Sequence, residues 1–352
     1  MNRQMVRDAA GPVDGGRRYD VVVIGGGAAG LAGALTLSRA RRSVLVVDDG
    51  RPRNAPAEGV HGYLALDGTP PRELLAAGRA EVRRYGGEFA DGTVVSAERD
   101  GADFRVTLAD GTGVRAARLL VTSGLTDELP PVPGLAGLWG TGVLHCPYCH
   151  GWEVRDQPIG VLATSPMAAH QALLWRQWSD DVMLFLHTGP EPTDEEYEQL
   201  AARGIAVVDG PVAAVESADG RLSGVRLAGG TVIARRALVV APRFTARAGF
   251  LASLGLRAED QEMRGTVIGS RIAADPTGQT SVPGVWVAGN VTSATDQVIG
   301  SAAAGVRAGA VINADLIDEE ARRAVAARST PFSAEQERRT AERVLGDGRH
   351  GL

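Results

Sequence analysis

The sequence lacks the features that mark several classes of protein. Two cysteines among 352 residues are too few for a small domain held together by disulfides. Lysine and arginine number 37 against 42 acidic residues, so the net charge of −5 gives no positive field to attract nucleic acid or anionic lipid. No apolar run approaches the roughly 18 residues that would span a bilayer. We therefore expect neither a nucleic acid nor a membrane as a partner.

The N-terminus is also poor in apolar residues. Residues 1–18 are polar and rich in Arg and Gly, and they lack the apolar core of a secretion signal. We expect a disordered tail here and a cytoplasmic location for the protein. At about 150 residues per domain the length predicts two domains, and the 46 glycines indicate many tight turns.

Residues 19–49 have the pattern strand, glycine turn, helix, strand. The turn reads Gly25-Gly26-Gly27-Ala28-Ala29-Gly30, and the second strand ends at Asp48. Gly25 permits the tight turn, Gly27 lets a pyrophosphate approach the backbone, and Gly30 lets the helix and strand pack closely. Asp48 is placed to accept a hydrogen bond from a ribose hydroxyl. This context predicts a dinucleotide site at the edge of a parallel sheet.

The rest of the chain adds helices and short strands. We expect helices at 71–85 and 301–316, an antiparallel layer over 93–122 with a hairpin turn at Asp110-Gly111, and a Pro-rich linker at 129–134. The tail from Asp318 is charged. Within it, Ser333-Ala334-Glu335-Gln336 fits a capping box, which predicts a surface helix over 334–345.

Residues 158–186 repeat the opening topology without its glycines. The turn of this second unit reads Ala163-Thr164-Ser165-Pro166-Met167-Ala168, so side chains stand where a pyrophosphate would need bare backbone. Ser165 can cap the helix and Pro166 can start it. We expect a β-α-β unit kept for structure; nicotinamide binding by a degenerate turn is the alternative.

Both cysteines lie in the string His145-Cys146-Pro147-Tyr148-Cys149-His150. Covalent haem attachment needs export, zinc needs a second ligand pair, and two structural thiols would be inert. A redox-active dithiol is favoured, because neighbouring histidines lower a thiol pKa and make exchange fast. Either His145 or His150 is a candidate proton carrier, and Asp296 is a candidate carboxylate to orient one of them. We expect no metal.

The order of these motifs resembles the low-molecular-weight thioredoxin reductase family. The resemblance covers roughly 19–316 and rests on the glycine turn, Thr122-Ser123-Gly124, the C-x-x-C pair and the string from Pro283 to Asn290. It implies an α/β fold with two Rossmann-like dinucleotide-binding domains, the second inserted in the first. The implied limits are 19–130 with 248–317 for an FAD-binding domain, 131–247 for a degenerate NAD(P)-binding-like domain with the dithiol, and 318–352 for a charged extension.

Three departures from thioredoxin reductases narrow the resemblance. The second glycine motif is lost, His150 follows the second cysteine in place of Asp, and Asn290 replaces the Asp that closes the C-terminal flavin motif. With a histidine on each side of the pair, the chain is similar to the thioredoxin reductase-like dithiol oxidases that close disulfides in natural products such as gliotoxin and holomycin. The implied partners are a small-molecule dithiol and O₂, in a homodimer.

The resemblance also assigns the cofactor contacts. FAD would be held by Gly25, Gly27, Ala28, Ala29, Gly30, Asp48, Asp49, Arg53, Asn54, Val94, Thr122, Ser123, Gly124, Gly289, Asn290, Gln297 and Val298. Cys146 is expected to exchange with the substrate dithiol, and Cys149 to lie against the flavin and pass the electron pair to it, with O₂ then reduced to H₂O₂. The alternatives are a disulfide reductase fed by NADPH or ferredoxin and a non-catalytic flavin redox sensor.

Overall fold

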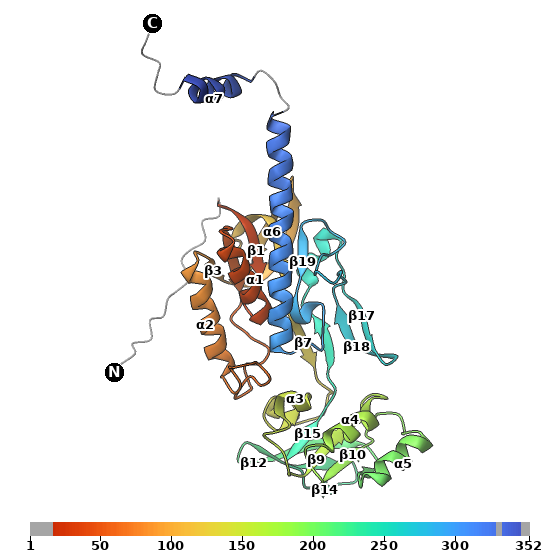
Figure 1. Cartoon of the computed structure of the whole chain (residues 1–352). Helices are drawn as coiled ribbons and strands as arrows, with labels where there is room; N and C mark the ends of the chain where they lie inside the picture. Colours follow the sequence, from red (N-terminus) through yellow and green to blue (C-terminus); the bar gives the residue numbers. More distant parts are fainter. Residues whose placement is uncertain (1–16, 329–332, 346–352) are drawn as a thin grey trace, which may run out of the picture.

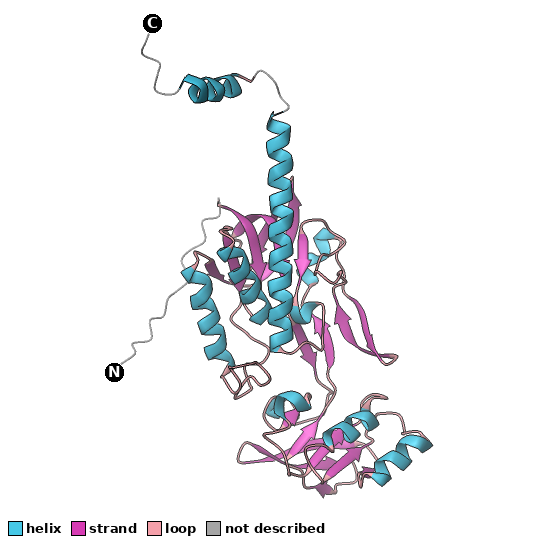
Figure 2. Ribbon diagram, in the orientation of Figure 1, coloured by secondary structure: helices cyan, strands magenta, loops and turns pink. Residues whose placement is uncertain are grey.

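The protein forms two α/β bodies joined by two neighbouring stretches of chain, as Figures 1 and 2 show. A computed structural model describes residues 17–328 and 333–345. The expected tail over 1–18 lies outside the described residues except for its last two, and Arg18 already begins the first strand. No helix in the described ranges combines the length and the apolar composition that crossing a membrane requires.

The first body, called here the first unit, is built on a seven-stranded sheet of order β3-β2-β1-β6-β5-β4, with β19 paired to β6. Its strands are β1 (Arg18–Ile24), β2 (Val44–Asp48), β3 (Glu88–Asp91), β4 (Val94–Asp100), β5 (Asp103–Leu108), β6 (Gly113–Val121) and β19 (Val285–Val287). The expected antiparallel layer is confirmed as β4, β5 and β6. It is part of the parallel sheet, because β6 pairs antiparallel with β5 and parallel with β1 and β19.

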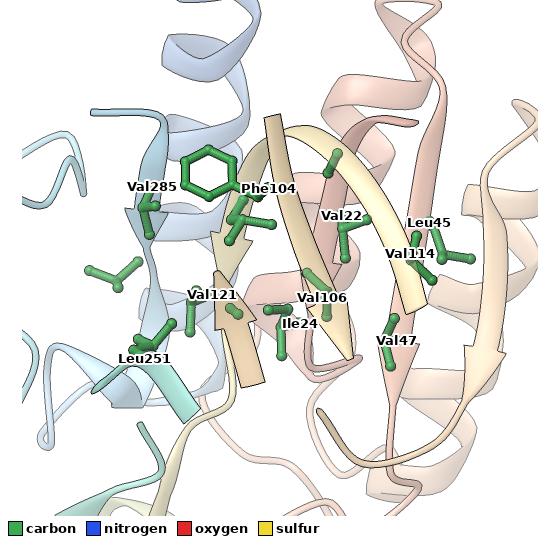
Figure 3. Packing of buried hydrophobic residues seen from close by; sticks show 14 of the residues in the cluster. Val22, Ile24, Leu45, Val47, Phe104, Val106, Val114, Val121, Leu251 and Val285 are labelled. Carbon is green, nitrogen blue, oxygen red and sulfur yellow. The ribbon is translucent and has the colours of Figure 1, made fainter. Parts of the chain in front are cut away.

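The central strand β1 is buried on both faces, which explains its unbroken apolar run. Val22 and Ile24 pack with Phe104 on one face of the sheet, in the cluster shown in Figure 3. Val21 and Val23 point to the other face and pack against helices. This burial fixes the position of the glycine turn at the carboxyl end of β1.

Three helices cover the first unit: α1 (Ala28–Arg39), α2 (Pro71–Arg84) and α6 (Val298–Arg328). Helix α1 packs directly on α6, where a Cβ added to Gly305 would overlap the carbonyl oxygen of Ala29. Helix α6 continues twelve residues beyond the expected end at Leu316. Ion pairs of Arg118 with Asp315 and Glu319 anchor the charged part of α6. Helix α7 (Ala334–Leu345) confirms the capping-box prediction.

The second unit has a five-stranded parallel sheet of order β11-β10-β9-β15-β8 and a three-stranded sheet of order β12-β13-β14. Its strands are β8 (Val143–Leu144), β9 (Ile159–Leu162), β10 (Val182–Phe185), β11 (Ala206–Val208), β12 (Val212–Ala218), β13 (Arg221–Leu227), β14 (Val232–Ile233) and β15 (Ala237–Val239). Its helices are α3 (Pro147–His150), α4 (Ala168–Trp175) and α5 (Asp194–Ala202). The expected helix start at Pro166 is wrong by two residues.

The chain leaves the first unit and returns to it side by side. Strand β7 (Leu125–Glu128) pairs antiparallel with β16 (Arg243–Ala246), in a four-stranded sheet completed by β17 (Glu259–Met263) and β18 (Thr266–Arg271). Three short 3₁₀ helices complete the described elements: η1 (Ala136–Leu138), η2 (Gly249–Leu254) and η3 (Gly289–Val291). The expected fold class is confirmed: the second unit is inserted in the first. The residue limits given above for the domains stay a prediction.

Candidate active site

A cavity of about 1590 Å³ runs between the two units, from the glycine turn past the two cysteines to the second turn. Small-molecule pockets typically measure about 300–1000 Å³, so this cavity has room for a dinucleotide and a further ligand. Every residue predicted as catalytic or cofactor-binding lines it except Gly30, which lies behind the turn.

The glycine turn leaves bare backbone facing the cavity. Gly25 has a φ of +107°, and a Cβ added there would overlap the carbonyl oxygen of Thr122. A Cβ on Gly30 would overlap the Gly25 carbonyl oxygen, whereas one on Gly27 would meet nothing within 4 Å. No side chain caps the start of α1 at Gly27. Its first N–H groups therefore face a space that fits a pyrophosphate.

The two acids at the end of β2, Asp48 and Asp49, have hydrogen-bond partners within the protein. Asp48 accepts hydrogen bonds from the Gly26 N–H, at 3.0 Å, and from Arg79, at 3.2 Å. The structure thus gives Asp48 a role in holding the turn that the sequence did not predict. Burial alone would raise the pKa of Asp49, but hydrogen bonds from Arg247 and Arg51 outweigh burial and lower it.

Thr122 and Ser123, the residues directly after strand β6, hold the backbone around the glycine turn. The Thr122 hydroxyl donates to the carbonyl oxygens of Ile24, at 3.1 Å, and Gly25, at 2.8 Å. The Ser123 hydroxyl donates to the carbonyl oxygen of Arg247. The motif Thr122-Ser123-Gly124 therefore positions backbone. Both of its hydroxyl groups already donate hydrogen bonds to backbone carbonyl oxygens of the protein.

Cys146 is the N-cap of the one-turn helix α3 and Cys149 is its third residue, with the two sulfurs 2.7 Å apart. Both thiols are free in this structure. A hydrogen bond from Cys149 lowers the pKa of Cys146 to about 7, aided by the backbone N–H groups of Cys149 and Tyr148 and by the side chain of Gln297. The same contact and burial raise the pKa of Cys149, while Arg53 opposes that rise. The reduced pair therefore holds its first negative charge on Cys146.

The two histidines that bracket the pair have different surroundings. Nδ1 of His145 lies 3.0 Å from the carbonyl oxygen of Val240, which can only accept, so the proton is on Nδ1 and the lone pair is on Nε2. His145 also packs edge-on against Phe244. Both ring nitrogens of His150 are buried without a partner among the described residues. Burial lowers the pKa of both histidines, so both are neutral at pH 7.

The expectation that Asp296 orients a histidine does not match the structure. Its Oδ1 accepts from the Ser293 hydroxyl at 2.9 Å, and no hydrogen bond joins it to either histidine within 17–328. Asp127 and Glu153 are the carboxylates whose charges act on His145 and His150, respectively.

Sequence reasoning missed two side chains that act on the pKa values of the dithiol. Arg53 is held by Asp127 through hydrogen bonds of 2.8 and 2.6 Å, and its charge acts on Cys149. The side chain of Gln297, expected as a cofactor contact, helps to lower the pKa of Cys146. These partners are 74 residues or more apart in sequence, so no local pattern could have indicated them.

The turn of the second unit carries side chains into the cavity. Thr164, Ser165 and Met167 line it, while Ala163 is buried. A Cβ added to Gly189 would lie 2.7 Å from the Cβ of Ala163. In this unit the glycine that permits close packing is therefore Gly189, which lies opposite the turn. His187 accepts a hydrogen bond from the Val212 N–H.

Comparisons with known proteins agree with this geometry. The model of the pyridine nucleotide-disulphide oxidoreductase family matches residues 19–309. The thioredoxin reductase sirT of Leptosphaeria maculans is 31% identical over 84% of this chain and 93% of its own, and the thioredoxin reductase tcpT of Claviceps purpurea is 30% identical over 85% and 94%. The crystal structure of HlmI superposes with a TM-score of 0.82 at 46% identity, over 91% of this chain and 99% of that one.

These relatives confirm the expected resemblance to thioredoxin reductase-like flavoproteins, and with it FAD as the cofactor. The residues fit this group, because the bare backbone at Gly27, the uncapped start of α1 and the long cavity match a dinucleotide. The chain belongs to the pyridine nucleotide-disulphide oxidoreductase family, and it is a thioredoxin reductase-like oxidoreductase that binds FAD.

Proposed function

We propose that the protein is an FAD-dependent dithiol oxidase, which closes a disulfide in a small-molecule dithiol and reduces O₂ to H₂O₂. One observation carries the proposal. A free dithiol lines the same cavity as the glycines of the first turn, whereas the second turn lines it with Thr164 and Ser165 in place of glycines. The chain therefore keeps the dithiol and the flavin site that oxidation needs, and it lacks the glycine turn that the pyrophosphate of a nicotinamide cofactor needs.

His145 is the base that we propose for the incoming thiol. Its Nδ1 proton is committed to the Val240 carbonyl, so Nε2 is the nitrogen that can accept a proton. Because burial lowers the pKa of His145, the ring stays neutral at pH 7 and is ready to accept. His150 has no such fixed tautomer and is the second candidate for moving a proton.

The exchange takes place at the oxidised pair. A substrate thiolate attacks Sγ of Cys146, a substrate–Cys146 disulfide forms, and Cys149 leaves with the electron pair of the broken bond. The second substrate thiolate then attacks the substrate sulfur of this mixed disulfide, so the substrate disulfide forms and Cys146 leaves. A thiol with a lower pKa leaves faster, and the pKa of Cys146 is about 7.

FAD, when bound, supplies the two-electron chemistry that reoxidises the reduced pair and hands the electrons to O₂. We propose that FAD is held by the predicted cofactor-binding residues that line the cavity. The chain's contribution is to hold Arg53 in place through Asp127 and Asn290, because the positive charge of Arg53 lowers the pKa of Cys149 and so favours its thiolate. Overall, a dithiol and O₂ give a disulfide and H₂O₂.

The second candidate is a disulfide reductase that takes electrons from NADPH or ferredoxin. The names of the relatives from Claviceps purpurea and Leptosphaeria maculans, both thioredoxin reductases, favour it. A redox sensor without catalysis has no specific observation in its favour. The loss of bare backbone at Ala163–Ala168 is our reason for preferring the oxidase.

We further propose a cytoplasmic homodimer. Ile299, Val306 and Ile317 are 40 to 50% exposed and lie along one face of α6, as apolar residues at an interface between subunits would. The balanced composition gives no reason to add nucleic acid or membrane as a partner.

The test is oxygen consumption by the FAD-loaded protein with dithiothreitol as the dithiol, in the absence of NADPH. We expect one H₂O₂ for each disulfide formed, measured by an oxygen electrode and a peroxide assay. Reduction of disulfides with NADPH or reduced ferredoxin, together with no oxygen uptake from dithiols, would establish the reductase instead.

A further inference from the structure

The two stretches of chain that join the units form a paired frame at the edge of the cavity. Strand β16, on which the chain returns to the first unit, pairs Phe244 with Asp127 of β7 on one side and with Gly269 of β18 on the other. A Cβ added to Gly269 would overlap the carbonyl oxygen of Phe244, so these two strands approach closely. Phe244 lines the cavity but is only 4% exposed. Its backbone is therefore fixed from both sides.

Arg53 lies over the ring of Phe244 and is itself fixed. Its guanidinium carbon is 5.3 Å from the centre of the Phe244 ring, within the range of a cation–π interaction. Nε and Nη2 of Arg53 donate to the two carboxylate oxygens of Asp127, at 2.8 and 2.6 Å, and Nη1 donates to Oδ1 of Asn290 at 3.3 Å. Such a two-point bond to a carboxylate fixes the plane of a guanidinium. Because Asp127 is also the cross-strand neighbour of Phe244, one pair of strands holds both groups.

His145 is held by the same returning stretch of chain. The N–H of Val240 donates to the carbonyl oxygen of Leu144 at 2.8 Å, and the carbonyl oxygen of Val240 lies 3.0 Å from Nδ1 of His145. A single hydrogen bond fixes one atom of an imidazole but not the plane of its ring. The Phe244 ring supplies the second constraint, because it meets the His145 ring edge-on, with the ring centres 5.1 Å apart and the planes 74° apart.

We propose that Phe244 is a positioning residue for the base: it fixes the plane of the His145 ring, and Arg53 holds Phe244 in place for this task. The role rests on the proposed function, because it serves proton transfer by His145. The sequence gave no expectation for Phe244, and Arg53 was expected only as a cofactor contact.

The contact has two consequences for the base. Phe244 contributes to the burial of the imidazole, and burial is the largest cause that lowers the pKa of His145. The fixed ring also keeps its proton on Nδ1, so that Nε2 stays the accepting nitrogen. The charges that act on His145 are those of Arg53, which lowers its pKa, and Asp127, which raises it, and Cys146 is the next residue in the chain. Loss of the Phe244 ring should therefore raise the pKa of His145 and mix its two tautomers.

The experiment follows the titration of His145 by NMR and needs neither O₂ nor a substrate. In the FAD-loaded protein with isotope-labelled histidine, the signal of His145 is the one that His145→Asn removes. The shift of its Cε1–H group gives the titration midpoint, and the shifts of its nitrogens give the tautomer. We expect the parent protein to show the Nδ1–H tautomer and a midpoint below the ordinary 6.5. Phe244→Ala should raise this midpoint by about one pH unit.

Matched variants separate positioning from packing alone. Phe244→Tyr keeps the ring and should keep both the midpoint and the tautomer. Phe250→Ala removes another phenylalanine that lines the cavity, from η2, and should leave His145 unchanged. Arg53→Met should raise the midpoint as well. Combined with Phe244→Ala it should give less than the sum of the two shifts, because Arg53 acts partly through Phe244.

An unchanged midpoint and tautomer in Phe244→Ala would overturn the proposal, whether or not the variant keeps FAD. Equal shifts in Phe244→Ala and Phe250→Ala would also overturn it, because any loss of packing in the cavity would then have the same effect. If Phe244→Ala does not fold, Phe244→Leu decides in its place, with an expected rise of about half a pH unit.

Two further outcomes limit the proposal. Fully additive shifts of Arg53→Met and Phe244→Ala would remove Arg53 from it. Oxygen uptake by the parent protein is measured separately from these spectra, so the loss of this proposal is distinguishable from the loss of the oxidase.

Discussion

The two units of this protein have the same strand, turn, helix and strand, yet they treat the turn in opposite ways. In the first unit four glycines surround the start of α1, and in the second the start of α4 follows Ala163, Thr164 and Ser165. Both turns fold and both face the same cavity. The comparison teaches that a strand-turn-helix-strand unit folds without glycines in its turn, whereas binding a pyrophosphate requires a turn without side chains.

The glycines of the first unit divide by what surrounds them. Gly25 and Gly30 are required by packing, because a side chain at either would overlap the backbone. Gly27 is different, since open space lies where its side chain would be. In the second unit, Ala163 fills the turn and the close approach moves to Gly189. Among Gly25, Gly27 and Gly30, only Gly27 has no packing reason to lack a side chain, and a bound pyrophosphate would supply one.

Replacing either cysteine should have the largest effect on activity, because it removes the reacting dithiol of the second unit and leaves the cofactor site of the first unit intact. Cys146→Ser and Cys149→Ser should each abolish dithiol oxidation and keep FAD. In Cys146→Ser the remaining Cys149 thiolate, with Arg53 nearby, should give a broad long-wavelength charge-transfer band with the flavin. The band should weaken as the pH falls and the thiolate is protonated, as absorbance spectra would show.

The two variants also test the order of the sulfurs. Cys149→Ser should lack the band and form a mixed disulfide with an activated substrate thiol through Cys146, seen as an increase in intact mass. A band in Cys149→Ser would reverse the roles of the two cysteines. Full activity in both variants would show that the dithiol is structural.

A smaller effect should follow from filling the first turn. Gly27→Val places methyl groups in the open space at the start of α1, so FAD affinity should fall about tenfold or more while the apoprotein keeps its melting temperature. Thr164→Val is the matched control in the second unit and should leave FAD content unchanged. Flavin absorbance per protein and thermal melting of the apoproteins measure both. Equal FAD loss in the two variants would contradict the division between the turns.

The sequence predicted best where the signal is local. The first unit follows from the apolar run of β1 and the spacing of Gly25, Gly27 and Gly30, which place strand, turn and helix within a few residues of one another. The capping box at Ser333 predicted α7 correctly for the same reason. The end of α6 was missed, because its charged turns are anchored by Arg118 from a distant strand.

Contacts across the cavity could not be predicted from the sequence. Arg53 pairs with Asp127, 74 residues later in the sequence, and Gln297 acts on the pKa of Cys146, which lies in the other unit. Asp296 shows the converse, since the carboxylate that the sequence suggested for a histidine accepts its hydrogen bond from the nearby Ser293. The sequence pattern therefore identified residues that line the cavity, whereas the partners of these residues could be identified only in the folded structure.

The smallest effect is expected from NADPH, and it is the sharpest test of the second turn. A nicotinamide dinucleotide needs its pyrophosphate close to backbone N–H groups, and the second turn presents Thr164 and Ser165 to the cavity in place of glycines. NADPH mixed anaerobically with the oxidised protein should therefore leave the flavin absorbance unchanged over the time of a catalytic turnover, whereas dithiothreitol should bleach it. Bleaching by NADPH at the rate of turnover would show that this turn still binds a dinucleotide. The two units would then be equivalent in function, and the reductase would replace the oxidase.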